Sequence, residues 1–138
     1  MQSGPDKYQV LLIEDDLIDQ EYFRRIIKRT TQVEVTSANC LQDGIELLRE
    51  RSFDAVLFDL GLPDSFGIDT VKRMTEEFGN LPLIVLTGSV DKQTAEEASQ
   101  FGVCGYLVKG ETTSTEIIDT VHSAVESRSL DHATNLSD

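Results

Sequence analysis

Short apolar runs alternate with segments of helical period along the chain, and this alternation repeats five times. The runs are rich in valine, isoleucine and leucine, which is typical of strands that are covered on both faces. We expect strands at Tyr8 to Ile13, Val33 to Ser37, Ala55 to Phe58, Leu83 to Leu86 and Gly105 to Val108. The pattern therefore predicts a sheet buried between two layers.

The segments between these runs place apolar residues three or four positions apart, which indicates amphipathic helices. In the first segment Ile18, Tyr22 and Ile26 fall on one predicted inner face, and Leu41 to Leu48 shows the same spacing. The other expected helices run from about Ile68 to Phe78, Lys92 to Phe101 and Thr113 to Glu126.

Strands and helices that alternate with short connections restrict the topology. Right-handed crossovers then produce a parallel sheet with helices on both faces. We predict an α/β fold of the doubly wound (βα)5 type. Ligands of such sheets bind outside the carboxyl ends of the strands, so five loops are the places to look for chemistry.

The composition fits a single acidic domain. The 138 residues include 12 lysines and arginines and 25 aspartates and glutamates, which gives a formal net charge of −13. We expect one domain over residues 8–127, with polar tails at 1–7 and 128–138. This charge disfavours nucleic acid and anionic membranes as partners, and no apolar run approaches the ~20 residues of a membrane-spanning helix. We therefore expect a cytoplasmic protein.

The two cysteines, Cys40 and Cys104, lack the spacing of a zinc or redox site. Both stand beside apolar residues. We expect reduced, buried thiols at both positions.

Acidic side chains follow two of the expected strands. Glu14-Asp15-Asp16 comes directly after the first strand, and Asp59 comes directly after the third. Carboxylates that converge at one end of a sheet repel one another, which favours a bound cation. Oxygen ligands with room for water suit Mg²⁺ or Mn²⁺. For Asp15 or Asp16 taken alone, capping of the next helix is as good an explanation as metal binding.

The fourth and fifth strands end in groups that suit a phosphoryl oxygen. Thr87-Gly88-Ser89 offers a hydroxyl and backbone N–H groups beside a glycine, although such a turn is also common in loops. Lys109 ends the fifth strand at the acidic rim of the sheet. It is a counter-ion for the carboxylates, a ligand for an incoming anion, or both in turn.

With these elements in order, the sequence resembles a receiver domain of the two-component response regulator family. The resemblance also includes the family spacing Asp-x₃-Pro-x₃-Gly, here Asp59, Pro63 and Gly67, and it covers about residues 8 to 127. It implies a flavodoxin-like sheet of strand order 2-1-3-4-5. It further implies that Asp59 accepts a phosphoryl group, with Mg²⁺ (or Mn²⁺) held by Glu14, Asp15, Asp59 and the backbone carbonyl of Gly61.

The resemblance also assigns the remaining site residues. Thr87 and the Gly88 N–H bind one phosphoryl oxygen and Lys109 binds another, while Thr87 and Tyr106 form the switch. From the residues alone, Tyr106 is instead a half-buried strand aromatic with its hydroxyl in water. Asp16 lies beyond the matched pair, so we expect it to cap a helix or to be solvated.

Two residues depart from the family pattern. Gly110 stands where the family usually has a proline joined to the lysine by a cis peptide bond, so the stiffness of this loop is in question. Gly61 stands where many relatives have a larger polar side chain. We hypothesise that the lifetime of the phosphoryl group depends mainly on loop packing and on Ser89.

The resemblance implies a signalling switch rather than an enzyme. The phosphoryl donor would be a sensor histidine kinase or a histidine phosphotransfer protein, docked on the first helix near Gln20 and Arg24. The effector would be a separate protein, and the receiver a monomer or weak dimer, either stand-alone or part of a longer regulator.

Three alternatives were weighed against this function. A Mg²⁺-dependent phosphohydrolase with an aspartyl nucleophile needs a second carboxylate two residues after the nucleophile, where this chain has Gly61. A flavin site would need a phosphate cradle at Glu14-Asp15-Asp16. A receiver-like scaffold that is never phosphorylated is the third alternative, and the presence of all five site elements disfavours it. His122 and His132 are candidate relay phosphohistidines, but structural or solvated roles are favoured for both.

Overall fold

A five-stranded parallel sheet runs through the middle of the computed structural model, which describes residues 7–29, 32–88 and 91–137. Its strands are β1 (Tyr8–Ile13), β2 (Val33–Ala38), β3 (Ala55–Asp59), β6 (Leu83–Thr87) and β7 (Gly105–Val108). They lie in the order β2-β1-β3-β6-β7, and every neighbouring pair is parallel. The predicted doubly wound fold with strand order 2-1-3-4-5 is confirmed.

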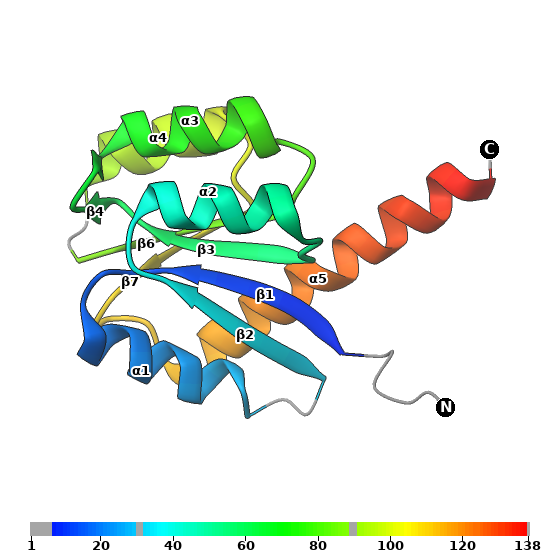
Figure 1. Cartoon of the computed structure of the whole chain (residues 1–138), viewed down its shortest axis with the longest axis horizontal. Coiled ribbons are helices and arrows are strands. Elements are labelled where there is room, and N and C mark those ends of the chain that lie inside the picture. Colours follow the sequence, from blue (N-terminus) through cyan, green and yellow to red (C-terminus); the bar gives the residue numbers. More distant parts are fainter. Residues whose placement is uncertain (1–6, 30–31, 89–90, 138) are drawn as a thin grey trace.

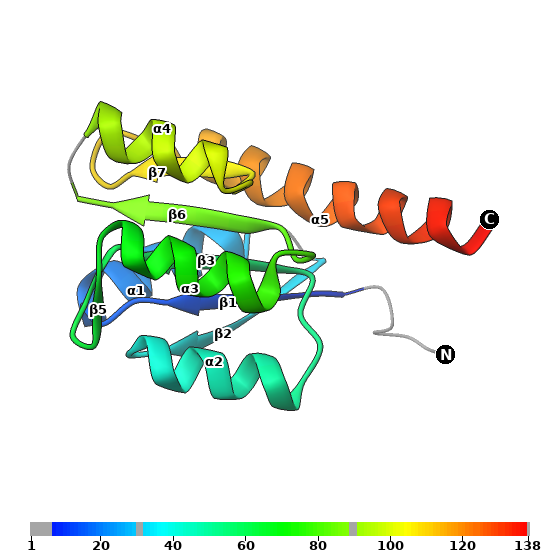
Figure 2. The same cartoon turned by 90° about the horizontal axis from the view of Figure 1, so that it is seen from above.

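Five helices cover the two faces of this sheet (Figures 1 and 2). One face carries α2 (Leu41–Glu50), α3 (Ile68–Phe78) and α4 (Lys92–Gln100), and the other carries α1 (Leu17–Ile27) and α5 (Ser114–Ser137). Strand β1 shows why both faces must be apolar. Leu11 and Ile13 pack toward α2, whereas Val10 and Leu12 pack toward α1 and α5, and all four are fully buried.

The buried face of α1 differs from the one that the spacing predicted. Phe23, Ile26 and Ile27 are buried, but Ile18 is 82% exposed and Tyr22 is 47% exposed. Each step of four residues turns about 40° beyond a full turn of an α-helix. Over two such steps the stripe from Ile18 to Ile26 leaves the face that contacts the sheet. The prediction was therefore wrong for Ile18 and Tyr22.

Helix α5 also differs from the prediction. We expected it to end at Glu126 and residues 128–138 to form a tail, but the helix continues to Ser137. Figure 2 shows this last part running beyond the sheet. The segment contains no glycine or proline to end a helix. Its polar composition concealed it because the prediction relied on apolar periodicity.

The cysteines are free but less buried than predicted. Cys40 is partly buried and Cys104 is exposed, so the expectation of two buried thiols was wrong. Cys40 serves as the N-cap of α2, with its Sγ accepting the N–H of Asp43 at 3.5 Å. Its apolar neighbours in sequence belong to the packed faces, whereas the cap itself lies at the edge of the core.

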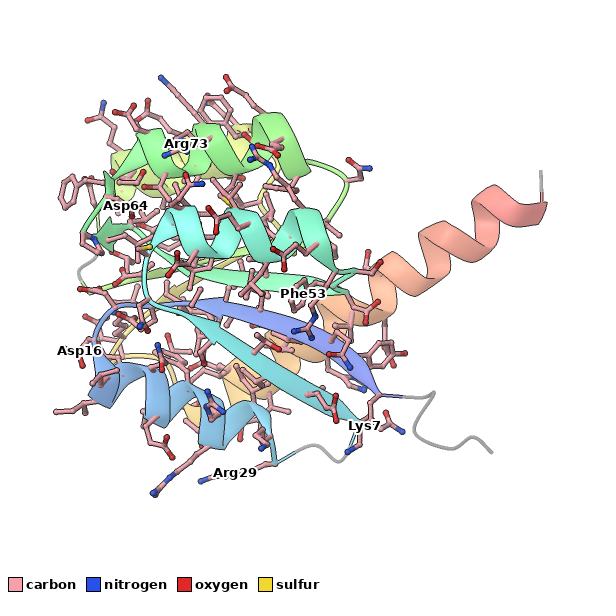
Figure 3. The ribbon with its side chains drawn as sticks, in the orientation of Figure 1. Lys7, Asp16, Arg29, Phe53, Asp64 and Arg73 are labelled. Carbon is pink, nitrogen blue, oxygen red and sulfur yellow. The ribbon has the colours of Figure 1, made fainter. Side chains whose placement is uncertain are left out.

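A small antiparallel hairpin follows β3, and no sequence pattern predicted this hairpin. It consists of β4 (Gly61–Leu62) and β5 (Ser65–Phe66). Between them, Asp64 accepts the N–H groups of Leu41 at 2.8 Å and Gln42 at 2.9 Å, at the start of α2 (Figure 3). Burial opposes ionisation of Asp64, but these donors outweigh it and lower its pKa. The loop after Asp59 is thereby tied to α2.

Replacing Asp64 by alanine is expected to lower the free energy of unfolding by about 1 kcal/mol, because two N–H groups at a helix start lose their acceptor. Urea unfolding measures the change. Asp119→Ala is the matched control because Asp119 is exposed on α5. An equal loss in both variants would contradict this role for Asp64.

Candidate functional site

The register of the sheet brings four predicted site residues to one edge. Ile13 pairs with Phe58, so the next residues, Glu14 and Asp59, leave adjacent strands at the same level. Asp59 pairs with Leu86, which precedes Thr87, and Thr87 pairs with Val108, which precedes Lys109. Burial between two helical layers fixes these strands, so the positions of the four side chains follow from the core.

Three carboxylates form a group that could hold a metal ion. One oxygen each from Glu14, Asp15 and Asp59 lies within 4.8 Å of the others. Glu14 is fully buried and Asp59 is 6% exposed, whereas Asp15 is exposed. Such a hard, negative donor set, open on one side, fits Mg²⁺ or Mn²⁺. Gly61 joins the group through its N–H, which donates to Asp59 Oδ1 at 3.1 Å.

The ammonium group of Lys109 lies among carboxylates from three elements. It forms an ion pair with Glu14 Oε1, and it donates to Asp59 Oδ2 at 2.9 Å and to Asp19 Oδ2 at 3.1 Å. The side chain of Lys109 is 16% exposed. Asp19 was not among the predicted site residues. Its only signal in the sequence is its place one turn into the helix after Glu14-Asp15-Asp16.

Burial and the contacts between Lys109 and the carboxylates shift the pKa values of this site. Burial raises the pKa of Glu14 to about 7, although the hydrogen bond with Lys109 acts in the opposite direction. Burial alone would lower the pKa of Lys109, but Glu14 and Asp59 outweigh it and raise that pKa above its ordinary value. Lys109 therefore stays protonated, and one ammonium group does not offset the surrounding carboxylates.

A cleft of about 380 Å³ opens beside this cluster. Its lining includes Asp59, Phe66, Thr87, Gly88, Asp91, Tyr106 and Lys109. Gly88 is exposed, and a Cβ added there would meet no other atom within 4 Å. The cleft therefore leaves open space over Asp59, next to the hydroxyl of Thr87.

The Tyr106 side chain is half-buried and packs against the core under α2, α3 and α4. Its hydroxyl oxygen is buried, so the expectation of a hydroxyl in water was wrong. Burial raises the pKa of the Tyr106 phenol, and the neighbouring Thr87 side chain partly opposes that shift. The two residues expected to form a switch thus line the same cleft, and within the described residues the Tyr106 hydroxyl has no hydrogen-bond partner.

The loop after Lys109 lacks the family's cis proline. Within the described residues no peptide bond is cis, and Gly110 has a φ of 81°, which favours glycine. Backbone and side-chain hydrogen bonds hold the loop instead. The N–H of Lys109 donates to Thr87 O at 2.7 Å, and Thr112 Oγ1 accepts the Val108 N–H at 3.0 Å while donating to Val108 O at 2.8 Å.

Two further expectations concern residues near the site. Asp16 caps α1, where its Oδ1 accepts the N–H groups of Ile18 at 2.9 Å and Asp19 at 3.0 Å, so its predicted capping role is confirmed. Ser89 lies outside the described residues.

In the described part of the chain, no helix is both long and apolar enough to cross a membrane.

Two curated proteins are similar in sequence to most of this chain. The response regulator UvrY of Escherichia coli (strain K12) is 26% identical over 115 residues, which cover 83% of this chain and 52% of UvrY. The cell cycle transcriptional regulator CtrA of Caulobacter vibrioides (strain NA1000 / CB15N) is 30% identical over 125 residues, covering 91% of this chain and 53% of CtrA. The chain thus spans about half the length of these curated relatives.

Solved structures show the same fold. A CheY-like receiver domain protein from Methanospirillum hungatei JF-1 has a TM-score of 0.80 at 18% identity, covering 91% of this chain and 98% of that chain. A LuxR-family two-component response regulator from Aurantimonas sp. SI85-9A1 has a TM-score of 0.79 at 25% identity, covering 88% of this chain and 87% of that chain. The model of the response regulator receiver domain family matches residues 10–122. The chain therefore belongs to the response regulator receiver domain family of two-component signalling.

Proposed function

We propose that this receiver is a phosphorylation-dependent switch in which Asp59 accepts a phosphoryl group from a phosphohistidine of a partner protein. The observation that supports this most is the position of Asp59. It is a nearly buried carboxylate at the wall of an open cleft, within hydrogen-bond distance of Lys109 and beside Glu14 and Asp15. An oxygen of Asp59 attacks phosphorus, the N–P bond to histidine breaks, and the imidazole nitrogen takes up a proton.

The residues around Asp59 supply the electrostatic conditions for this step. Glu14, Asp15 and Asp59 would hold the cation, which when bound offsets the repulsion between a carboxylate and an anionic phosphoryl group. The ammonium group of Lys109 is placed to donate to a phosphoryl oxygen on Asp59. The hydroxyl of Thr87 and the N–H of Gly88, which line the same cleft, would bind a second oxygen.

Thr87 would transmit the new charge to Tyr106. A phosphoryl group carries roughly −1.5 to −2 charges and strong acceptors, so it attracts the Thr87 hydroxyl away from its present contact. Tyr106, on β7, lines the same cleft as Thr87, so a movement of Thr87 would change the space available to the Tyr106 ring. The output surface would include exposed residues of α4 such as Gln93, Glu96 and Gln100, and a separate effector protein would bind there.

The structure changes which residues of α1 we propose as the partner's docking surface. Gln20 and Arg24 have partners within the chain, because Gln20 donates to the Glu14 carbonyl at 2.8 Å and Arg24 donates to Ser37 at 2.8 Å. The exposed apolar side chains of the helix are Leu17, Ile18 and Tyr22, at 70%, 82% and 47% exposure. These three suit an apolar helix of a sensor histidine kinase or a histidine phosphotransfer protein.

Incubation with acetyl phosphate or phosphoramidate, with and without Mg²⁺, followed by intact mass measurement tests this function. We expect one phosphoryl adduct that requires Mg²⁺, is lost in Asp59→Ala and persists in Asp119→Ala, a control on the exposed face of α5. No adduct in the presence of Mg²⁺ would indicate a scaffold. Steady release of phosphate from unrelated monoesters would indicate a phosphohydrolase instead.

A further inference from the structure

Among the described residues, Asp19 is linked to the predicted site through the ammonium group of Lys109. A lysine ammonium has three N–H donors, and at Lys109 they face three carboxylates, those of Glu14, Asp59 and Asp19. Glu14 and Asp59 also belong to the group of carboxylates that could hold a metal ion, whereas Asp19 does not. Asp19 therefore binds the lysine without belonging to the metal group.

A rigid element presents Asp19 to the site. It lies in the first turn of α1. Its own N–H donates at 3.0 Å to Oδ1 of Asp16, the residue that caps the helix. Phe23, Ile26 and Ile27 anchor the same helix to the sheet. The carboxylate of Asp19 thus approaches Lys109 from a packed helix, not from a loop.

Hydrogen bonds hold the backbone of the loop that carries Lys109, so the part left to restrain is the long lysine side chain. A lysine side chain has four rotatable bonds and loses considerable entropy when it is held in one position. A third carboxylate contact from outside the loop restricts the ammonium group directly.

We propose that Asp19 is a positioning residue that holds the ammonium group of Lys109 beside Asp59. By sharing that ammonium group, Asp19 also leaves more negative charge at Glu14 and Asp59 for a divalent cation. The inference rests on the proposed function and adds to it a side chain from α1. Asp19 contacts neither the cation nor the phosphoryl group in this arrangement.

Two substitutions separate the charge of Asp19 from its hydrogen bond. In Asp19→Ala both are lost, so we expect Mg²⁺ to bind about fivefold more weakly, which is the range of a partly exposed ion pair. Phosphorylation by acetyl phosphate at saturating Mg²⁺ should also slow by about fivefold. Asp19→Asn keeps an acceptor for Lys109, so it should recover most of the rate while Mg²⁺ binding stays weak.

Isothermal titration calorimetry measures Mg²⁺ binding in the absence of any phosphoryl donor, and intact mass follows phosphorylation over time. Glu21→Gln is the matched control, because it removes one charge from the same helix at an exposed residue whose partner is Arg25 at 3.0 Å. Urea unfolding of each variant shows whether the fold is intact. A role in stability alone would not produce the difference between Asn and Ala at saturating Mg²⁺.

The outcomes also distinguish this inference from the proposed function. If the unmodified protein takes up a phosphoryl group and Asp19→Ala matches it in Mg²⁺ affinity and rate, Asp19 is not a positioning residue and the proposed function stands. If Glu21→Gln weakens Mg²⁺ binding as much as Asp19→Ala, the effect is general charge and the inference is overturned. If the unmodified protein neither binds Mg²⁺ nor takes up a phosphoryl group, both are overturned.

Discussion

Replacing Lys109 by alanine is expected to slow the phosphorylation of Asp59 by acetyl phosphate about a hundredfold, although Mg²⁺ should bind more tightly. The rate falls because the ammonium group, 2.9 Å from Asp59 Oδ2, is the cation placed to donate to the transferred group. Removal of one such donor from a preorganised site typically costs about a hundredfold or more in rate. The two effects therefore have opposite signs.

Tighter Mg²⁺ binding follows from the charge balance of the site. Lys109 is the counter-ion of Glu14 and Asp59, both of which are buried. Without Lys109, the repulsion between these two carboxylates is uncompensated. A bound divalent cation then gains the attraction of carboxylates that the ammonium group otherwise neutralises. We expect the dissociation constant of Mg²⁺ to fall by about tenfold, because charges a few Å apart in a cleft open to water interact by about 1 to 2 kcal/mol when one of them is divalent.

Calorimetry with Mg²⁺ and intact mass measurements over time check the two effects on the same samples. Lys109→Arg keeps the charge and should bind Mg²⁺ close to normally. Lys7→Ala is the matched control, because Figure 3 places Lys7 at the end of the sheet opposite Asp16, where it pairs with Glu34 at 3.7 Å. Weaker Mg²⁺ binding in Lys109→Ala would contradict the role of Lys109 as a counter-ion.

The sheet could be predicted from the sequence because its central strands are buried on both faces. Every residue of β3 is buried, so this strand is a continuous run of apolar residues that ends at Asp59. The hairpin of β4 and β5 could not be found in this way, because strands of two residues carry no periodicity. Asp64, which ties this hairpin to α2, looked like any acidic turn residue.

Helix α1 shows a different limit. Leu17 and Ile18 are apolar yet exposed, so the apolar residues of this helix lie on a solvent-facing surface as well as on the packed face. Periodicity alone does not separate a buried face from an exposed face when both are apolar. The prediction consequently counted Ile18 and Tyr22 as core residues.

The candidate site could be predicted where its residues end strands, and not where they lie on a helix. Glu14, Asp59 and Lys109 each follow an apolar strand, and the register of a parallel sheet then brings them together. Asp19 is one of 25 acidic residues, and its approach to Lys109 depends on how α1 packs across the sheet. Spacing along the chain carries no information about that placement.

Replacing Glu14 by glutamine is expected to raise the free energy of unfolding of the metal-free protein at pH 8 relative to the unmodified protein. Glu14 is fully buried, and its burial raises its pKa from 4.5 to about 7. A carboxyl whose pKa is higher in the folded state contributes stability that is fully present below the unfolded pKa and is lost as pH rises through the folded pKa. The unmodified protein therefore loses stability between about pH 4.5 and 8.

The size and direction of the effect can be followed by urea unfolding in EDTA across that range. Glutamine keeps the size of the side chain without ionising, so the stability advantage of Glu14→Gln should grow with pH to no more than about 3 kcal/mol. Glu76→Gln, at an exposed position of α3, should show no such trend. Mg²⁺ should stabilise the unmodified protein at pH 8 more than Glu14→Gln, because the variant lacks one of the three carboxylates. An advantage that stays constant with pH would mean that Glu14 is already ionised throughout, and that Lys109 outweighs its burial.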